Sequence, residues 1–105
     1  MKDFEMTRTS KFDAADYLKT PEQIAAYLTE ALETGDTAFV CTALDTVARA
    51  KGMSSVAKAT GLGRESLYKS LSGSTKPEFE TIAKIVNSFG VKLVAQPIED
   101  EKRVA

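Results

Sequence analysis

The feature that most constrains the fold of this chain is a Gly-Leu-Gly corner at residues 61–63, which joins two short stretches of helical apolar spacing. Gly61 stands where the first helix must end in a left-handed residue, a conformation that glycine adopts without steric cost. Leu67 and Leu71, four residues apart, are expected to bury the inner face of the second helix. Ala57 is small enough for the two helices to cross closely. The spacing therefore predicts a tight pair of helices.

Charged side chains occupy the face of the second helix that its leucines leave uncovered. Arg64 stands in the first turn, and Glu65 and Lys69 are four residues apart on the side away from Leu67. This layout, at residues 54–72, is typical of a helix-turn-helix whose second helix enters the major groove of DNA. We expect all three side chains to contact bases, since arginine pairs bidentately with guanine, although Lys69 can equally reach a phosphate. The spacing also allows a mutual Glu65–Lys69 ion pair on a solvated face.

Hydroxyl and cationic side chains around the corner are expected to contact DNA phosphates. The first helix opens with two serines, and its N-terminal amides suit a phosphate. Tyr68 is expected to be partly buried near the two leucines, with its hydroxyl toward the DNA. The alternative for the whole segment is an ordinary helical hairpin that touches no nucleic acid. The expected phosphate contacts are Ser54, Ser55, Ser66, Tyr68, Ser72, Ser74, Thr75 and Lys76.

The charges of the chain are unevenly distributed, although the formal net charge is only −1. Residues 1–36 contain four Lys or Arg and eight Asp or Glu, whereas residues 37–77 contain six and two. Residues 78–105 contain four and five. The positive charge therefore coincides with the corner, where it would attract a phosphate backbone. A solvated basic surface explains the charge alone, but not this coincidence.

Composition indicates a single globular domain, because 105 residues with 43% hydrophobic and 28% charged side chains suit one helical core. No apolar run approaches the roughly 18 residues of a membrane span, and the polar N-terminus is unlike a secretory signal, so we expect a cytoplasmic protein without a membrane partner. The chain has no histidine, and its one cysteine, Cys41, has apolar neighbours and is expected to be buried. We therefore expect no enzyme, no metal or other cofactor, and no small-molecule substrate.

Cap signals and apolar periodicity predict an all-α domain over residues 13–97, with residues 1–12 as a flexible arm and residues 98–105 as a frayed tail. The start and stop signals of the helices are Asp13, Thr20 with Pro21 and Gln23, Gly35 with Asp36, Gly52, Pro77 with Glu78, and Gly90. The apolar positions outside the corner that are predicted to face the core are Ile24, Tyr27, Leu28, Ala31 and Leu32, then Phe39, Val40, Ala43, Leu44, Val47 and Ala48, and finally Phe79, Ile82, Ala83, Val86 and Phe89.

The apolar period changes from helical to alternating after Gly90, which predicts a strand over residues 91–96. A strand without a partner in its own chain has unpaired backbone groups, so we expect it to pair with the same strand of a second copy. The resulting homodimer would present two recognition helices to successive major grooves. An edge strand packed only on its own helices is the alternative. The expected dimer-strand residues are Val91, Lys92, Leu93, Val94 and Ala95.

Three stretches carry a more specific signature and together cover nearly all of residues 13–93. They are DAADYLKTPEQIAAYLTEALETGD, ALDTVARAKGMSSVAKATGLGRESLYKSLS and KPEFETIAKIVNSFGVKL. This combination resembles the HigA-like addiction-module antidotes, small bacterial antitoxins of the wider lambda-repressor-like group. The resemblance implies a five-helix repressor-like domain, dimerisation, binding of double-stranded DNA at the operator of its own operon, and neutralisation of a RelE/HigB-like toxin that cleaves messenger RNA.

Two other functions fit the same residues. A stand-alone prophage-type repressor would bind DNA without a toxin partner, and its gene would lack a neighbouring toxin reading frame. A protein-interaction module without DNA binding would not bind the promoter DNA of its own gene. For the toxin contact, the sequence offers only the acidic first third, which would attract a basic partner.

Overall fold

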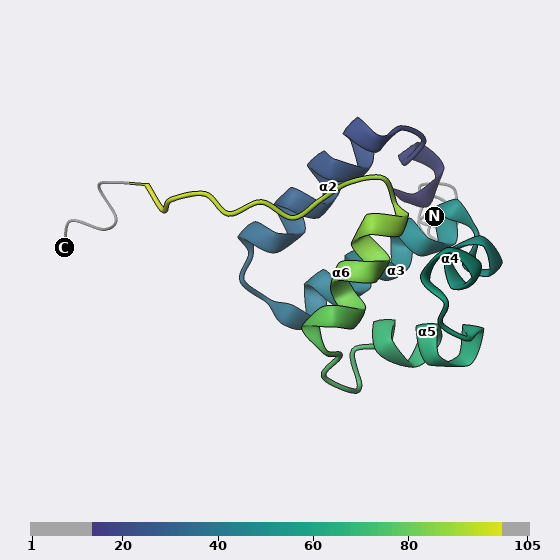
Figure 1. The fold of residues 1–105 in the computed structure, drawn as a ribbon. Helices are drawn as coiled ribbons and strands as arrows, with labels where there is room; N and C mark the ends of the chain where they lie inside the picture. The colour runs from purple at the N-terminus through teal and green to yellow at the C-terminus, as the bar shows by residue number, and fades with distance from the viewer. Residues whose placement is uncertain (1–13, 100–105) are drawn as a thin grey trace, which may run out of the picture.

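Helix α3 lies at the centre of the fold, where it contacts η1, α2, α4 and α5, while α6 packs against α4 (Figure 1). The structure, a computed structural model, describes residues 14–99. The predicted all-α class with five α-helices is confirmed for these residues. Their elements are the 3-10 helix η1 (Ala14–Tyr17) and the α-helices α2 (Pro21–Glu33), α3 (Thr37–Lys51), α4 (Met53–Thr60), α5 (Arg64–Leu71) and α6 (Phe79–Ser88).

Side-chain caps set where α2 and α3 begin. The Thr20 hydroxyl accepts a hydrogen bond from the Gln23 amide, and Gln23 Oε1 accepts one from the Thr20 amide, both at 3.1 Å. This is the reciprocal capping box that the sequence predicts. Asp36 Oδ1 likewise accepts from the amides of Ala38 and Phe39, at 3.0 and 3.3 Å. Both helices therefore begin where their local sequence places the cap.

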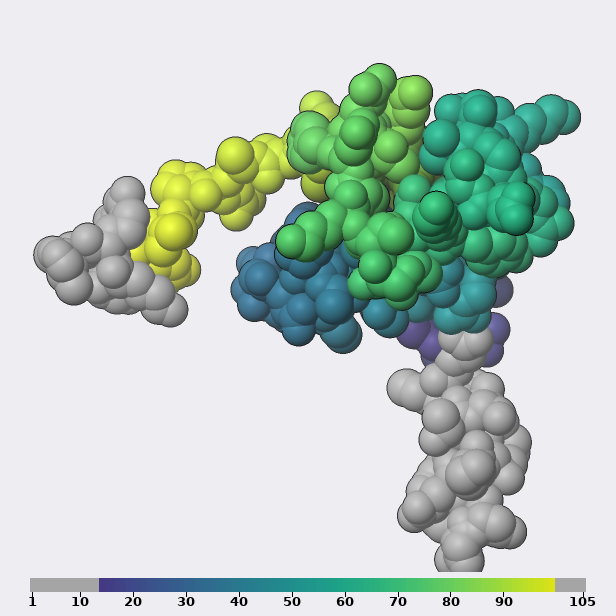
Figure 2. Space-filling model, turned by 90° about the horizontal axis from the view of Figure 1, so that it is seen from below, coloured from purple at the N-terminus to yellow at the C-terminus, as the bar shows by residue number. Residues whose placement is uncertain are grey.

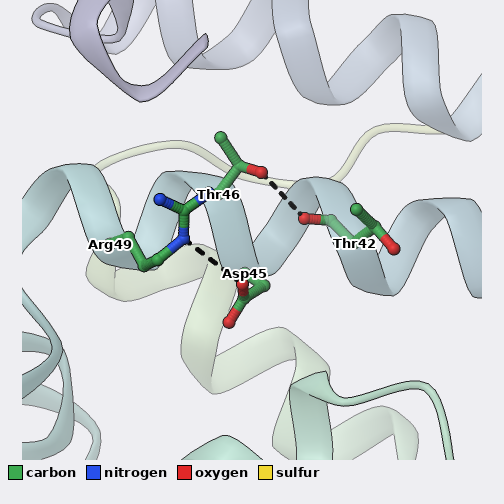
Figure 3. Close-up of polar contacts among 4 residues, drawn as sticks. All are labelled: Thr42, Asp45, Thr46 and Arg49. Carbon is green, nitrogen blue, oxygen red and sulfur yellow. Dashed lines mark hydrogen bonds and ion pairs between the residues drawn. The ribbon is translucent and has the colours of Figure 1, made fainter. Parts of the chain in front are cut away.

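Several polar side chains of α3 have partners within the helix (Figure 3). The buried Thr46 hydroxyl donates to the Thr42 carbonyl at 3.1 Å, and Arg49 Nε lies 3.4 Å from Asp45 Oδ2. Cys41 is buried, as predicted. Within residues 14–99, no buried side-chain nitrogen or oxygen lacks a hydrogen bond. Helix α3 can therefore pass through the core without the cost of an unpaired polar group.

One continuous core includes side chains from all five α-helices, and most of the predicted apolar positions belong to it. Three positions predicted to be buried are instead exposed, namely Leu32 at 47%, Phe39 at 48% and Phe79 at 73%. They lie at the edges of the apolar faces of α2, α3 and α6, where no other element covers them. Ile85, which was not among the predicted apolar positions, is fully buried, so the apolar face of α6 is centred further round the helix. The core residues are Leu18, Ile24, Leu28, Ala31, Ala43, Leu44, Val47, Ala48, Met53, Val56, Ala57, Leu67, Leu71, Ile85, Val86 and Phe89.

The strand predicted over residues 91–96 is not formed in the single chain. Gly90 has φ +85°, and the segment after it passes along α2 and then extends beyond the helices without strand pairing (Figure 1). The physical reason is that a strand needs a neighbouring strand for its hydrogen bonds, and all regular elements within residues 14–99 are helices. The alternative of an edge strand packed on its own helices is not observed either.

Several predictions fall on parts of the chain that the structure does not describe. The N-terminal arm at residues 1–12, the cap at Asp13 and the tail beyond Glu99 lie outside the described residues. Among the helices of residues 14–99, none has the length and apolar character needed to cross a membrane.

Candidate nucleic-acid interface

The corner between α4 and α5 is built from its own backbone and one hydroxyl. Gly61 follows α4 with a φ of +78°, and its amide donates to the Ala57 carbonyl at 3.0 Å, as a left-handed cap residue does. The Thr60 hydroxyl donates to the Val56 carbonyl at 2.8 Å and accepts from the Leu62 amide at 3.2 Å. Thr60 therefore stabilises the turn through hydrogen bonds, a role that apolar spacing does not reveal.

Helix α5 has one buried and one exposed side, as predicted. Leu67 is fully buried and Leu71 is 3% exposed, so these two side chains attach the helix to the core. Figure 2 views the molecule from the side on which α5 lies in Figure 1, and the surface of α5 is uncovered there. The exposed side chains of the helix are Arg64, Glu65, Ser66, Tyr68 and Lys69. The three predicted base contacts therefore share one accessible helix.

Arg64 is held by two of the side chains that were predicted to contact phosphates. Its Nη1 donates to Ser54 Oγ at 3.2 Å, and its Nη2 donates to the Tyr68 hydroxyl at 2.9 Å. The guanidinium carbon also lies 5.7 Å from the centre of the Tyr68 ring, within cation–π range. Tyr68 is 47% exposed, more open than the partial burial expected beside the leucines. The spacing of four residues between Arg64 and Tyr68 was the sequence signal for this contact.

Glu65 and Lys69 do not pair with each other. The ion pairs found within residues 14–99 join Arg49 to Asp45 and Lys84 to Glu80, on α3 and α6. The solvated Glu65–Lys69 pair that the spacing allowed is therefore not formed. Both side chains point from the exposed side of α5 without a partner among the described residues.

The loop after α5 uses its hydroxyls to close the helix. The Ser72 and Thr75 hydroxyls both donate to the carbonyl of Lys69, at 2.9 and 3.3 Å, and Ser74 Oγ lies 2.7 Å from Ser72 Oγ. Ser72 and Thr75 thus cap one C-terminal carbonyl of α5. They also hold an ordered row of exposed hydroxyls at the end of the candidate interface. Lys76 is exposed outside this hydrogen-bonded group and lines a different surface.

The N-termini of α4 and α5 have no side-chain caps. Their N-cap residues are Gly52 and Gly63, and neither provides a side-chain hydrogen bond. The first-turn amides of each helix are consequently available to an anion, which a helix N-terminus attracts. Ser54 and Ser55 lie exposed in the first turn of α4, and Ser66 lies in that of α5. Together with Arg64, these groups form a surface suited to phosphate oxygens and base edges.

A second candidate surface, which the sequence analysis missed, lies beside α6. It is an apolar hollow of about 600 Å³, which we call the α2–α6 hollow. The large apolar residues at the edges of three predicted helix faces were the sequence feature that could have indicated this hollow. The side chains that line it include Leu28, Leu32, Val40, Phe79, Ile82 and Leu93, with Lys76 at its border.

The fold and the exposed face of α5 define a small all-helical protein with a candidate binding surface for nucleic acid. Residues 8–97 match the family model described as "Probable addiction module antidote protein". The chain is also 38% identical over 85 residues to an uncharacterized protein of Haemophilus influenzae, an alignment that covers 81% of this chain and 88% of that protein. No solved structure matches the chain.

The chain belongs to the family of probable addiction module antidote proteins. This membership supports an antitoxin role and implies a cognate toxin as a partner. The antidote family expected from the sequence is therefore confirmed. The narrower HigA-like and lambda-repressor-like assignments stay predictions.

The conformations of the two glycines at the corner predict how substitutions there change the stability of the fold. Gly61→Ser should lower the free energy of unfolding by about 1–2 kcal/mol, because a side chain strains a left-handed residue. An added Cβ at Gly61 would meet no atom within 4 Å, so backbone strain is the only cost. Urea unfolding followed by circular dichroism measures this change.

Gly63→Ser is the matched control, with the same substitution two residues later. Gly63 has φ −71° and ψ 157°, the extended conformation of an N-cap. A serine there adds a hydroxyl that can accept from the first-turn amides of α5, so stability should rise by a few tenths of a kcal/mol, about 0.3. Equal losses at both positions would contradict the assignment of the strain to Gly61.

Proposed function

We propose that this antidote is a sequence-specific DNA-binding homodimer that represses its own operon and neutralises a RelE/HigB-like toxin. The observation that carries the DNA-binding part is the exposed face of α5, where Arg64 is presented beside Glu65 and Lys69. Base edges in the major groove offer the acceptors and donors that these side chains require. The protein would act in the cytoplasm, by binding DNA and the toxin and without catalysing a reaction.

The distribution of charge supports the same interface. The exposed cations Lys58, Arg64 and Lys69 lie on α4 and α5, in the segment where basic residues are in excess. The exposed carboxylates of α2 and its end, including Glu30 and Glu33, belong to a different part of the molecule. A phosphate backbone would therefore be drawn to α4 and α5 in preference to α2.

The C-terminal segment supports the homodimer. Val94 and Ile98 are 70% and 65% exposed, on a segment that passes along α2 and then extends beyond the helices (Figures 1 and 2). At the root of the segment, Leu93 lines the α2–α6 hollow together with the exposed Leu32 and Phe79. Antiparallel pairing of residues 91–96 across a two-fold axis would supply the missing backbone partners and bring apolar surface of the second copy to the hollow.

Antidote family membership favours a toxin partner over a stand-alone repressor.

DNA binding and toxin binding can be tested in separate experiments. Footprinting on the upstream region of the gene should reveal two protected half-sites whose centres are about 10 base pairs, or a multiple, apart. Absence of protection at physiological salt would refute DNA binding. Rescue of growth on co-expression with the neighbouring reading frame tests the toxin partner independently.

Arg64→Ala should weaken operator binding by about 1–3 kcal/mol and relax the base preference at one position of each half-site. Titrations on the operator and on its single-base variants measure both effects. Lys19→Ala removes a cation directly before α2 and should leave both unchanged, since the start of α2 and α5 lie at opposite sides of the molecule (Figure 1). Equal losses for Arg64→Ala on every DNA fragment would instead assign Arg64 to a phosphate.

Val94→Lys should weaken dimerisation by about tenfold or more, or about 1.4 kcal/mol, because it places a cation on each side of the proposed two-fold axis. Sedimentation equilibrium measures the dissociation constant. Ala26→Lys, an equivalent change at an exposed position of α2, is the control and should dimerise as the wild type does. A wild-type protein that stays monomeric at high concentration would exclude the dimer.

A further inference from the structure

Arg64 connects the two helices of the corner through side-chain hydrogen bonds alone. Ser54 belongs to the first turn of α4, and Tyr68 lies one turn after Arg64 in α5. The guanidinium uses one donor of Nη1 for Ser54 and one donor of Nη2 for Tyr68. It also lies 5.7 Å from the centre of the Tyr68 ring. All three residues are exposed, so solvent competes with these contacts and the arrangement is not a consequence of burial.

The arrangement leaves the arginine able to read a base. A guanidinium has five N–H donors, so the two bonds to hydroxyls leave Nε and one hydrogen on each Nη. Bidentate pairing with guanine needs only two of them. A side chain already held near one orientation loses less conformational freedom on binding than a free arginine does. The contacts therefore favour an orientation in which the Arg64 guanidinium is ready to pair with a base.

We propose that Tyr68 and Ser54 are positioning residues that hold Arg64 in the orientation for base reading, so that two hydroxyls control the specificity of the DNA site without touching a base. This inference rests on the proposed DNA binding and deepens it. It also changes the role expected for these residues, since their hydroxyls were predicted to contact phosphates. A phosphate contact would raise affinity for every sequence alike, whereas positioning of Arg64 acts at one base pair.

The test compares base discrimination, defined as the ratio of dissociation constants for an operator changed at the Arg64-dependent base pair and for the intact operator. Tyr68→Phe keeps the ring over the guanidinium and removes only the hydroxyl. It should lower this ratio about 3- to 10-fold, the range expected from one lost hydrogen bond, and leave discrimination at the other positions unchanged. In an Arg64→Ala background, the same substitution should have no further effect on the ratio.

Ser54→Ala should lower the same ratio, and Ser54→Thr, which keeps a hydroxyl, should restore it. Ser55→Ala is the matched control for the ratio, because Ser55 is the next exposed serine of the same helical turn but does not contact Arg64. Loss of a phosphate contact at Ser55 would weaken binding to all DNA fragments alike and leave the ratio unchanged. Uniform losses on all DNA fragments that persist in the Arg64→Ala background would overturn the inference, since Tyr68 and Ser54 would then touch the DNA themselves. Unchanged ratios for both Tyr68→Phe and Ser54→Ala would overturn it as well.

A measurement without DNA separates this inference from the proposed function. Rotation about the Cζ–Nη bonds of Arg64, followed by NMR of the guanidinium nitrogens, should be slower in the wild type than in Tyr68→Phe or Ser54→Ala. Equal rates in all three proteins would overturn the inference even if the operator is bound. A wild-type protein with slow rotation that binds no DNA would refute the proposed function and the reading role of Arg64 with it, leaving only the contacts that hold Arg64.

Discussion

The burial of two leucines against α3 is the interaction on which the rest of this structure depends. Helix α5 has only eight residues, and Leu67 and Leu71 are its only buried side chains. A helix of two turns is unstable in water by itself, so its existence rests on tertiary packing. The same packing fixes which side of α5 faces outward. Because Gly61 turns the chain sharply before it, the outward side comes to lie beside the first turn of α4, and Arg64 can reach Ser54 across the corner.

Hydrogen bonds at both ends of α5 add to the packing of its two leucines. At its N-terminal end, Arg64 is held by hydroxyls from two helices, and at its C-terminal end, the carbonyl of Lys69 accepts from Ser72 and Thr75. The exposed face thus has side-chain hydrogen bonds at both ends, while the Glu65 and Lys69 side chains on it have no partner among the described residues. Such hydrogen bonds reduce the ordering cost of binding, which suits a helix proposed to enter a groove of DNA.

Another part of the surface has apolar side chains that no element of the chain covers. The exposed side chains of Leu32, Phe39 and Phe79 lie at the edges of three helical faces, and the segment after Gly90 extends without a partner. An antidote needs a toxin-binding surface, and the proposed function adds contacts with DNA and with a second copy. The α2–α6 hollow and the adjoining segment fit the contact with a second copy, because they lie side by side and a two-fold interface uses the same patch on both copies.

The sequence by itself determined the features whose causes are local. The capping box at Thr20, the cap at Asp36, the left-handed Gly61 and the inward leucines of α5 each follow from a few neighbouring residues, and the antidote signature followed from short stretches of chain. Only the tertiary structure decided what depends on distant partners. Periodicity could not tell that Ile85 would be fully buried and Phe79 open, because burial depends on which elements cover a face. The alternation after Gly90 could not form a strand without a second strand to bond with. The link between Arg64 and Ser54, ten residues apart, required the close crossing of two helices before the side chains could meet.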